Sequence, residues 1–391
     1  MSVASRTTSE HNRPFASILI IGVGLIGGSI AAACKALPEG QRPYIRGIDI
    51  DSRAVKTAVE QAFLDEGAIP SDARTDSWLS TTADDLIVLA TPAREAKAWF
   101  ERIEGAGHRG VLTDVASTKA ALTALADGIL SCPQRYIPGH PMAGSEVNGI
   151  EGARATLFQN AHWILCPDAH SEPAAFTRLH ELITSLGARG ISLPREEHDD
   201  AMAIVSHVPH MVASALVQLA GTHAVERQEI FRLAAGGFKD TTRIAAGSPE
   251  LWSGIALDNR EALARGLAEV GRIIKGFEQA LAQGDSRGLT ALLAEAARLR
   301  RSIPATWVPD SDRLVEVRIP MANRAGVIAQ VTGFAGKAGC NIQSIDIDHI
   351  NEATAILELI LTDEGDLGSF TSQLIGDGFD VSLRPLAPAG S

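Results

Sequence analysis

Gly22-Val23-Gly24-Leu25-Ile26-Gly27 follows an apolar run, Ile18–Ile21, and opens a stretch of small residues, Ser29–Leu37, that is typical of a helix. A G-x-G-x-x-G hexapeptide between a strand and a helix is the context that a dinucleotide-binding fold requires. Its first glycine permits the tight turn, its second lets the backbone approach a pyrophosphate, and its third allows close contact between helix and strand. The N-terminus of the helix attracts the anion. The hexapeptide therefore predicts a Rossmann-type domain.

Short apolar runs continue to about Leu193 and alternate with helical patterns, as in a parallel sheet with crossover helices. The runs are Ile18–Ile21, Tyr44–Ile48, Leu86–Ala90, Val111–Thr113, Tyr136–Pro138, Trp163–Leu165 and Arg189–Leu193. We expect an α/β fold in which these runs build one doubly wound sheet, within a domain of residues 15–193.

The second run ends in Asp49, where the 2′-hydroxyl of a bound ribose needs a carboxylate acceptor. Because a carboxylate repels a 2′-phosphate, this residue favours NAD over NADP as the cofactor. Asp51 is an alternative acceptor, and Arg53 is close enough to accommodate a phosphate after all. The predicted cofactor-binding residues are Gly22, Gly24, Leu25, Ile26, Gly27, Asp49, Thr91 and Pro92.

The remaining sequence divides into a helical part and a second α/β part. From Pro194 to Ile303 the strand signal is absent, and Ala/Leu-rich stretches show helical spacing, which predicts an all-helical domain of residues 194–303. Several of these helices are apolar around most of their circumference, as in a bundle or a subunit interface. After a linker at Pro304–Ser311, residues 312–387 follow the β-α-β-β-α-β order of a ferredoxin-like fold.

Composition and charge exclude several classes of protein. The 391 residues carry a formal net charge of −12, which disfavours a nucleic-acid-binding protein, because such proteins cluster Lys and Arg against phosphates. The Cys and His residues lack metal-ligand spacing, so we expect no metal site. The apolar stretch Ala203–Ala220 contains His207, Pro209 and His210, so we expect no membrane span and a cytoplasmic protein.

Three polar clusters, added to the glycine hexapeptide, carry a family resemblance. They are Asp114-Val-Ala-Ser117-Thr-Lys119, then His140-Pro-Met-Ala-Gly-Ser-Glu146, and finally Ser206-His207-Val-Pro-His210 together with Gly237-Phe-Lys-Asp-Thr-Thr-Arg243. With these clusters, the chain resembles the prephenate dehydrogenase family from about Ile18 to about Ile303. Lys239 stands where the family commonly has Arg.

The resemblance implies NAD-dependent oxidative decarboxylation of prephenate to 4-hydroxyphenylpyruvate in tyrosine biosynthesis, by a homodimer joined through its helical domain. It makes His140 the acceptor of the substrate's hydroxyl proton, and imidazole suits this role because it titrates near working pH. Ser117 would orient His140 and touch the nicotinamide, and Arg243 would bind a substrate carboxylate. Further substrate contacts are assigned to His210, Glu146 and Trp252, whereas His198 and His207 are interpreted as structural.

Other activities stay open at this point. Arogenate dehydrogenase or broad cyclohexadienyl dehydrogenase activity is the nearest alternative, because the sequence does not show which pocket residues meet the substrate side chain. A β-hydroxy-acid dehydrogenase would use a lysine such as Lys239 or Lys275. A non-catalytic amino-acid sensor has no use for a proton acceptor, so the joint presence of Ser117, His140 and Arg243 disfavours it.

Residues 312–387 resemble an ACT domain, a small fold that in many amino-acid biosynthetic enzymes pairs with another copy and binds an amino-acid effector. The resemblance rests on Asn323-Arg-Ala-Gly-Val-Ile and Gly339-Cys-Asn-Ile, with Ala325 where the pattern usually has Pro. Tyrosine, as the end product, is the effector that this hypothesis predicts. The expected effector-binding residues are Asn323, Gly326, Val327 and Asn341.

Overall fold

The computed structural model describes residues 13–145, 147–224, 229–302, 314–322, 324, 326–349, 354–362 and 365–386. The chain divides into two compact units, Met1–Ile274 and Lys275–Ser391. Of the sequence predictions, the linker at 304–311 and the residues Glu146 and Asn323 lie outside the described part of the chain.

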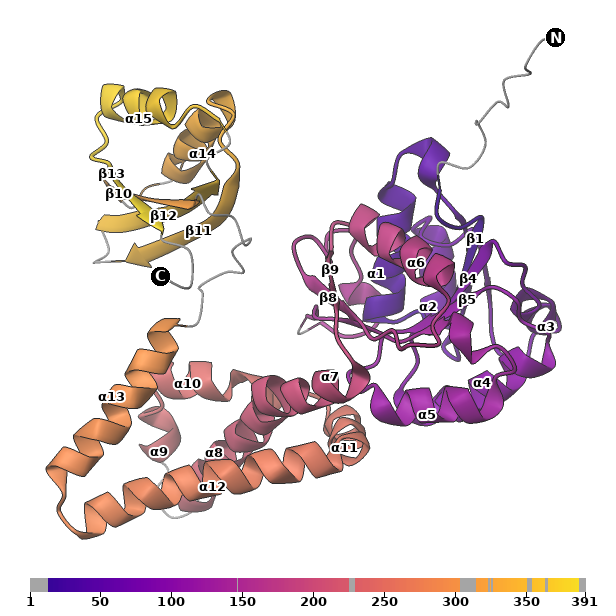
Figure 1. Cartoon of the computed structure of the whole chain (residues 1–391), viewed down its shortest axis with the longest axis horizontal. Helices are drawn as coiled ribbons and strands as arrows, with labels where there is room; N and C mark the ends of the chain where they lie inside the picture. The colour runs from indigo at the N-terminus through magenta and orange to yellow at the C-terminus, as the bar shows by residue number, and fades with distance from the viewer. Residues whose placement is uncertain are drawn as a thin grey trace. The chain divides into compact units, whose positions relative to one another are not determined.

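Six parallel strands form the main sheet of the first unit, in the order β3-β2-β1-β4-β5-β6. Its strands β1, β4 and β5 are labelled in Figure 1. The strands are β1 Ser17–Ile21, β2 Tyr44–Ile48, β3 Glu66–Ala68, β4 Asp85–Leu89, β5 Val111–Asp114 and β6 Tyr136–Ile137. The first five predicted apolar runs are therefore strands of one sheet, as expected. The short strand β3 reads Glu-Gly-Ala and has no apolar run, so the sequence pattern does not reveal it.

Helices cover both faces of this sheet, which explains why its strands are apolar throughout. Ile18 and Ile20 of β1 pack on one face with α1 (Leu25–Ala36), α2 (Ser52–Glu60) and α6 (Pro173–Ser185). Leu19 and Ile21 pack on the other face with α3 (Arg74–Leu79), α4 (Ala96–Gly105) and α5 (Ala120–Ile129). Alternate residues of one strand thus enter two separate cores, as in other doubly wound folds.

The last two predicted runs belong to a second, three-stranded sheet, so the expectation of a single seven-run sheet was wrong. In this sheet β8 (His162–Leu165) pairs antiparallel with β7 (Gly139–Pro141) and parallel with β9 (Arg189–Ser192). An apolar run indicates a buried strand but does not say which strand it pairs with. The short strand β7 carries His140.

The helical part of the first unit begins with α7 (Arg195–Met202) and α8 (Val208–Ala224), separated by a π-helical turn at Ala203–His207. Pro209 is the second residue of α8, and its ring removes a backbone N–H donor just after this turn. The next helices are α9 Glu229–Arg232, α10 Gly236–Thr242, α11 Pro249–Asp258 and α12 Arg260–Ala282. The last of these, α12, continues into the second unit.

The helical stretch Arg195–Ala224 is long and apolar enough, by length and composition, to cross a membrane. This is weak evidence for a span, because the core helix of a soluble protein meets the same criteria. The stretch also carries three buried histidines, His198, His207 and His210. Buried polar rings of this kind are expected in a protein interior rather than in lipid.

The second unit contains α13 (Ser286–Ser302) and a β-α-β-β-α-β domain. The domain's elements are β10 Leu314–Ala322, α14 Val327–Lys337, β11 Ile342–His349, β12 Thr354–Thr362, α15 Leu367–Gly376 and β13 Ser382–Leu386. Its antiparallel strands lie in the order β11-β12-β10-β13 around a core that includes Val317 and Phe370. This confirms the predicted ferredoxin-like order of elements.

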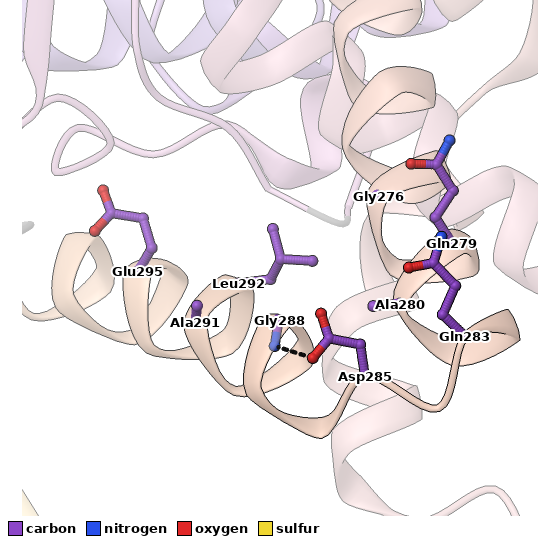
Figure 2. A pocket seen from close by; sticks show the side chains of 9 residues that line it. All are labelled: Gly276, Gln279, Ala280, Gln283, Asp285, Gly288, Ala291, Leu292 and Glu295. Carbon is purple, nitrogen blue, oxygen red and sulfur yellow. Dashed lines mark hydrogen bonds between the residues drawn. The ribbon is translucent and has the colours of Figure 1, made fainter.

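A groove in the second unit lies between the end of α12 and the start of α13 (Figure 2). The Gly288 amide, in the first turn of α13, donates a hydrogen bond at 2.9 Å to the carboxylate of Asp285, which directly precedes this helix. The lining residues are Gly276, Gln279, Ala280, Gln283, Asp285, Gly288, Ala291, Leu292 and Glu295. None of the predicted site residues is among them.

Candidate active site

The glycine hexapeptide forms a tight turn between β1 and α1. Gly22 has a φ of +101°, and a Cβ atom there would lie 2.5 Å from the Ala90 carbonyl oxygen, so only glycine fits. A Cβ on Gly27 would lie 1.9 Å from the Gly22 carbonyl oxygen, whereas one on Gly24 would meet no atom within 4 Å. The first and third glycines therefore allow close backbone packing, and the second leaves open space beside the start of α1.

Two polar side chains lie next to this turn at the carboxyl ends of β2 and β4. The Asp49 carboxylate accepts hydrogen bonds from the amides of Val23 at 2.6 Å and Asp51 at 2.8 Å. Asp51, the alternative ribose acceptor, instead accepts from the Arg53 amide at 2.9 Å and caps α2. Within the part of the chain that the structure describes, the buried Oγ1 of Thr91 has no hydrogen-bond partner.

These residues fit NAD. The N-terminus of α1 has no side-chain cap, so its free N–H groups can bind a pyrophosphate, and the space at Gly24 admits it. Asp49 lies beside the turn, where it can bind a ribose hydroxyl, and Thr91 offers an unpaired hydroxyl at the same edge of the sheet. Pro92 and the short 3₁₀ turn Ala93–Glu95 continue this edge.

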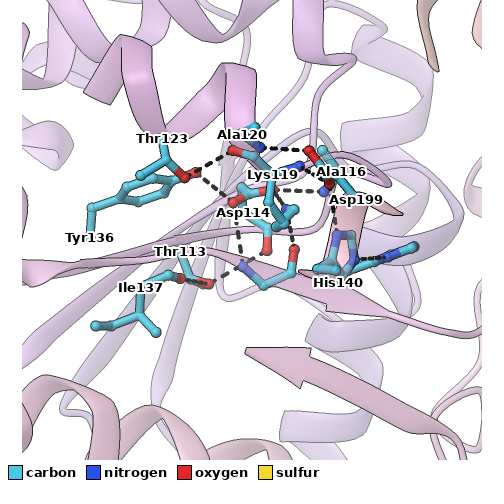
Figure 3. A network of polar contacts seen from close by, with 12 residues as sticks. Thr113, Asp114, Ala116, Lys119, Ala120, Thr123, Tyr136, Ile137, His140 and Asp199 are labelled. Carbon is cyan, nitrogen blue, oxygen red and sulfur yellow. Dashed lines mark hydrogen bonds and ion pairs between the residues drawn. The ribbon is translucent and has the colours of Figure 1, made fainter. Parts of the chain in front are cut away.

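A buried ion pair lies at the end of β5 (Figure 3). The Lys119 ammonium is fully buried and donates both to the Asp114 carboxylate and to the Gly139 carbonyl oxygen. The Tyr136 hydroxyl donates to the other oxygen of Asp114 at 2.6 Å. Burial raises the pKa of Tyr136 well above its ordinary value, and the Asp114 charge adds to this, so the phenol stays protonated. The network ties Gly139, and so the next residue, His140, to the end of β5.

His140 contacts a second histidine from the helical part of the unit. Its Nδ1 lies 2.9 Å from Nε2 of His198, and the two rings are 70° apart with centroids separated by 5.1 Å. Nδ1 of His198 in turn lies 2.8 Å from Oδ1 of Asp199. His198, interpreted from the sequence as structural, thus contacts His140 on β7 as well as Asp199, its neighbour on α7.

The surroundings of His140 favour its neutral form. Burial lowers the pKa of His140 well below its ordinary value of 6.5, and the positive charge of Lys119 acts in the same direction. A neutral imidazole with one ring nitrogen engaged by His198 retains the other nitrogen for proton transfer. His140 can therefore act as a general base near neutral pH.

A third group of side chains forms an aromatic wall. The rings of His210 on α8 and Trp252 on α11 are stacked, with centroids 3.6 Å apart and planes 15° apart, and His207 meets Trp252 edge-on. Nδ1 of His210 and Nε2 of His207 are buried without a hydrogen-bond partner in the described part of the chain. Unpaired buried nitrogens cost free energy, so they are expected where a ligand supplies the missing partner.

Arg243 begins a 3₁₀ turn, Arg243–Ala246, which packs against α8. The next residue, Gly247, lies so close to the wall that a Cβ atom there would be 2.6 Å from Nε1 of Trp252. The structure thus brings Arg243's turn beside the His210 and Trp252 pair. Ser117 is partly buried in the loop between Asp114 and Lys119, and its contact with a nicotinamide stays a prediction.

Comparison with known proteins identifies the family. Residues 31–192 match the family model "Prephenate dehydrogenase, nucleotide-binding domain", and residues 194–295 match "Prephenate dehydrogenase, dimerization domain". The prephenate dehydrogenase of Bacillus subtilis is 32% identical over 341 residues, which cover 86% of this chain and 89% of the relative. The chain belongs to the prephenate dehydrogenase family.

Two solved structures of similar proteins each match about three quarters of the chain. The prephenate dehydrogenase of Aquifex aeolicus, in complex with hydroxyphenyl propionate and NAD+, is 27% identical with a TM-score of 0.68, over 76% of this chain and all of that chain. The arogenate dehydrogenase of Synechocystis is 30% identical with a TM-score of 0.62, over 74% of this chain and all of that chain. The two models of the prephenate dehydrogenase family end before β10, so they do not include the ferredoxin-like domain.

We predict that kcat/KM for prephenate keeps its plateau at pH 6.5 and falls only under more acidic conditions. The pKa of His140 lies below 6.5, so the ring is neutral above that lowered value and loses its function as a base only when it is protonated. Initial rates of NADH formation across the pH range test this, with enzyme preincubated at each pH and assayed at neutral pH to control for unfolding. Half-maximal kcat/KM at or above pH 6.5 would contradict the assignment.

Proposed function

We propose that the chain catalyses the NAD-dependent oxidative decarboxylation of prephenate to 4-hydroxyphenylpyruvate, a step of tyrosine biosynthesis. The observation that carries the proposal is a buried, neutral His140 held between the end of the nucleotide-binding sheet and the helical part of the unit. Membership in the prephenate dehydrogenase family supports it.

The reaction needs a base, a cationic binding group and a hydride acceptor, and the chain accounts for the first two. Nε2 of His140 accepts the proton of the ring hydroxyl at C4 as the ring carboxylate leaves as CO2 and the ring becomes aromatic. Arg243 binds a carboxylate of the substrate through its planar guanidinium group. Ser117 orients His140 and touches the nicotinamide.

NAD, when bound, accepts the hydride from C4. The residues that we assign to hold it are Gly22, Gly24, Leu25, Ile26, Gly27, Asp49, Thr91 and Pro92. On the substrate side, His210 and Trp252 form a flat wall for the ring, and the unpaired Nδ1 of His210 gives the wall a polar atom for a substrate oxygen. Glu146 stays a proposed contact that controls access to the site.

The test is NAD reduction by the purified protein with prephenate, compared with His140→Asn. We expect the variant to lose about 100-fold or more of kcat, because general-base catalysis contributes that much, while its dissociation constant for NAD stays near that of the wild type. A wild-type protein that does not reduce NAD with prephenate would overturn the proposed function. A fully active His140→Asn variant would overturn only the role of His140.

Arogenate is the second candidate substrate, because one similar solved structure is that of an arogenate dehydrogenase. Prephenate and arogenate differ only in the side chain, which is a pyruvyl group in the first and an amino acid in the second. The same assay run with both substrates measures the preference as a ratio of kcat/KM values. A ratio that favours arogenate would replace the substrate in the proposal and leave the mechanism unchanged.

We also propose a homodimer formed through the helices. These helices expose large apolar side chains that a partner subunit would cover, among them Leu257 on α11, Ile273 and Leu281 on α12, and Leu293 on α13. Exposed apolar patches of this kind mark interaction surfaces, and the matching family model describes a dimerization domain. We retain a cytoplasmic location as part of this proposal.

The ferredoxin-like domain is proposed to be an ACT domain that binds tyrosine. Gly326 precedes α14 with a φ of +92°, and no atom lies within 4 Å of a Cβ built there, so the first amides of the helix are open to a carboxylate. Val327 is buried, and Asn341 lies in the turn before β11. Asn323 completes the proposed effector-binding set.

Tyrosine added to the wild-type enzyme is expected to lower prephenate turnover and raise the melting temperature. Coupling between two binding sites changes affinity by about 5- to 150-fold, which steady-state kinetics resolves. In a Gly326→Val variant, we expect tyrosine to lose its effect while turnover without tyrosine stays the same. Unchanged turnover and melting temperature on tyrosine addition to the wild type would contradict effector binding.

A further inference from the structure

Asp199 is held by two other elements of the first unit, one through its carboxylate and one through its backbone carbonyl. Its Oδ1 accepts from the Lys119 amide and its Oδ2 from the Ala120 amide, both at 2.8 Å, at the N-terminus of α5. The Asn259 side chain, at the end of α11, donates to the Asp199 carbonyl oxygen at 2.7 Å. Asp199 itself lies on α7, so its position is fixed from the nucleotide-binding part and the helical part together.

The ionised form of Asp199 is the stable one despite its burial. Burial alone raises the pKa of Asp199, but hydrogen bonds from His198, Ala120 and Lys119 outweigh it and hold the pKa below its ordinary value. An ionised carboxylate has no proton to donate, so each of its neighbours must donate to it. The ring of His198 therefore presents Nδ1–H to Oδ1 of Asp199.

The hydrogen bonds then determine where the proton lies on each ring. In neutral His198, protonated Nδ1 leaves Nε2 as an acceptor, so the bond to His140 requires Nδ1–H on His140 as the donor. In neutral His140, protonated Nδ1 leaves Nε2 with a free lone pair. The base thus has the one tautomer that can accept a proton from a substrate hydroxyl.

We propose that Asp199 and His198 are positioning residues that act through His140, by fixing its tautomer and by stabilising the positive charge that it gains. When Nε2 of His140 takes the hydroxyl proton, the imidazolium charge is shared through the Nδ1–H bond to His198 and is compensated by the carboxylate. This proposal rests on the proposed function, since the proton in question is that of the substrate.

Asp199 has a second, structural role at the start of α5, so its replacement alone does not isolate the positioning role. Two single variants and the double variant together isolate it. Asp199→Asn removes the charge, and His198→Phe removes the relay while leaving the carboxylate on the amides of Lys119 and Ala120. Asp200→Asn is the matched control, because Asp200 is the next residue, is exposed, and pairs only with Arg265 among the described contacts.

We expect Asp199→Asn and His198→Phe each to lower kcat by about 100-fold or more, with the KM for NAD within about 3-fold of the wild type. The double variant is expected to be no slower than the slower single variant, because both changes break one relay. Asp200→Asn is expected to keep the wild-type kcat. The melting temperature of each variant is measured alongside, so that loss of folded protein is not counted as loss of catalysis.

If Asp199→Asn does not fold, His198→Phe carries the test alone. Folded His198→Phe with kcat within about 3-fold of the wild type would overturn the proposal, as would additive losses in the double variant. A wild-type enzyme that does not reduce NAD with prephenate would instead refute the proposed function. The two failures are therefore distinguishable in one set of assays.

Discussion

A buried carboxylate at the start of α5 joins the two parts of the first unit on which the proposed chemistry depends. Asp199 comes from the helical part, yet its oxygens accept hydrogen bonds from the amides of Lys119 and Ala120, which follow the nucleotide-binding strand β5. Through His198 it also reaches His140. A carboxylate at a helix N-terminus is stabilising by itself. Here it also holds His140, the proposed base, near the edge of the sheet where the cofactor is proposed to bind.

The ion pair between Lys119 and Asp114 also stabilises the loop between β5 and α5. Because both charges are buried, removing either partner alone would leave an uncompensated charge, at a cost of about 3–5 kcal/mol. The pair holds the carbonyl oxygen of Gly139, and the positive charge of Lys119 also helps to keep the pKa of His140 low. Position and protonation state of the base therefore depend on one set of contacts.

Much of this arrangement is predictable from the sequence, and the exceptions have physical reasons. The glycine hexapeptide and the apolar runs specify local geometry and burial, so they identify the parallel strands and the roles of Gly22 and Gly27 in packing. They do not specify pairing between distant strands, which is why β8 and β9 were placed in the wrong sheet. His198 escaped functional assignment because its partner, His140, is 58 residues away in the sequence.

The central claim is that the neutral ring of His140 carries its proton on Nδ1. ¹⁵N NMR of the histidine side chains measures directly which ring nitrogen is protonated. Enzyme labelled at its histidines and assigned with His140→Asn is titrated at and around neutral pH. The arrangement of Asp199, His198 and His140 predicts a neutral His140 ring with its proton on Nδ1 and none on Nε2. A charged His140 ring at neutral pH, or a neutral ring with its proton on Nε2, would contradict this account.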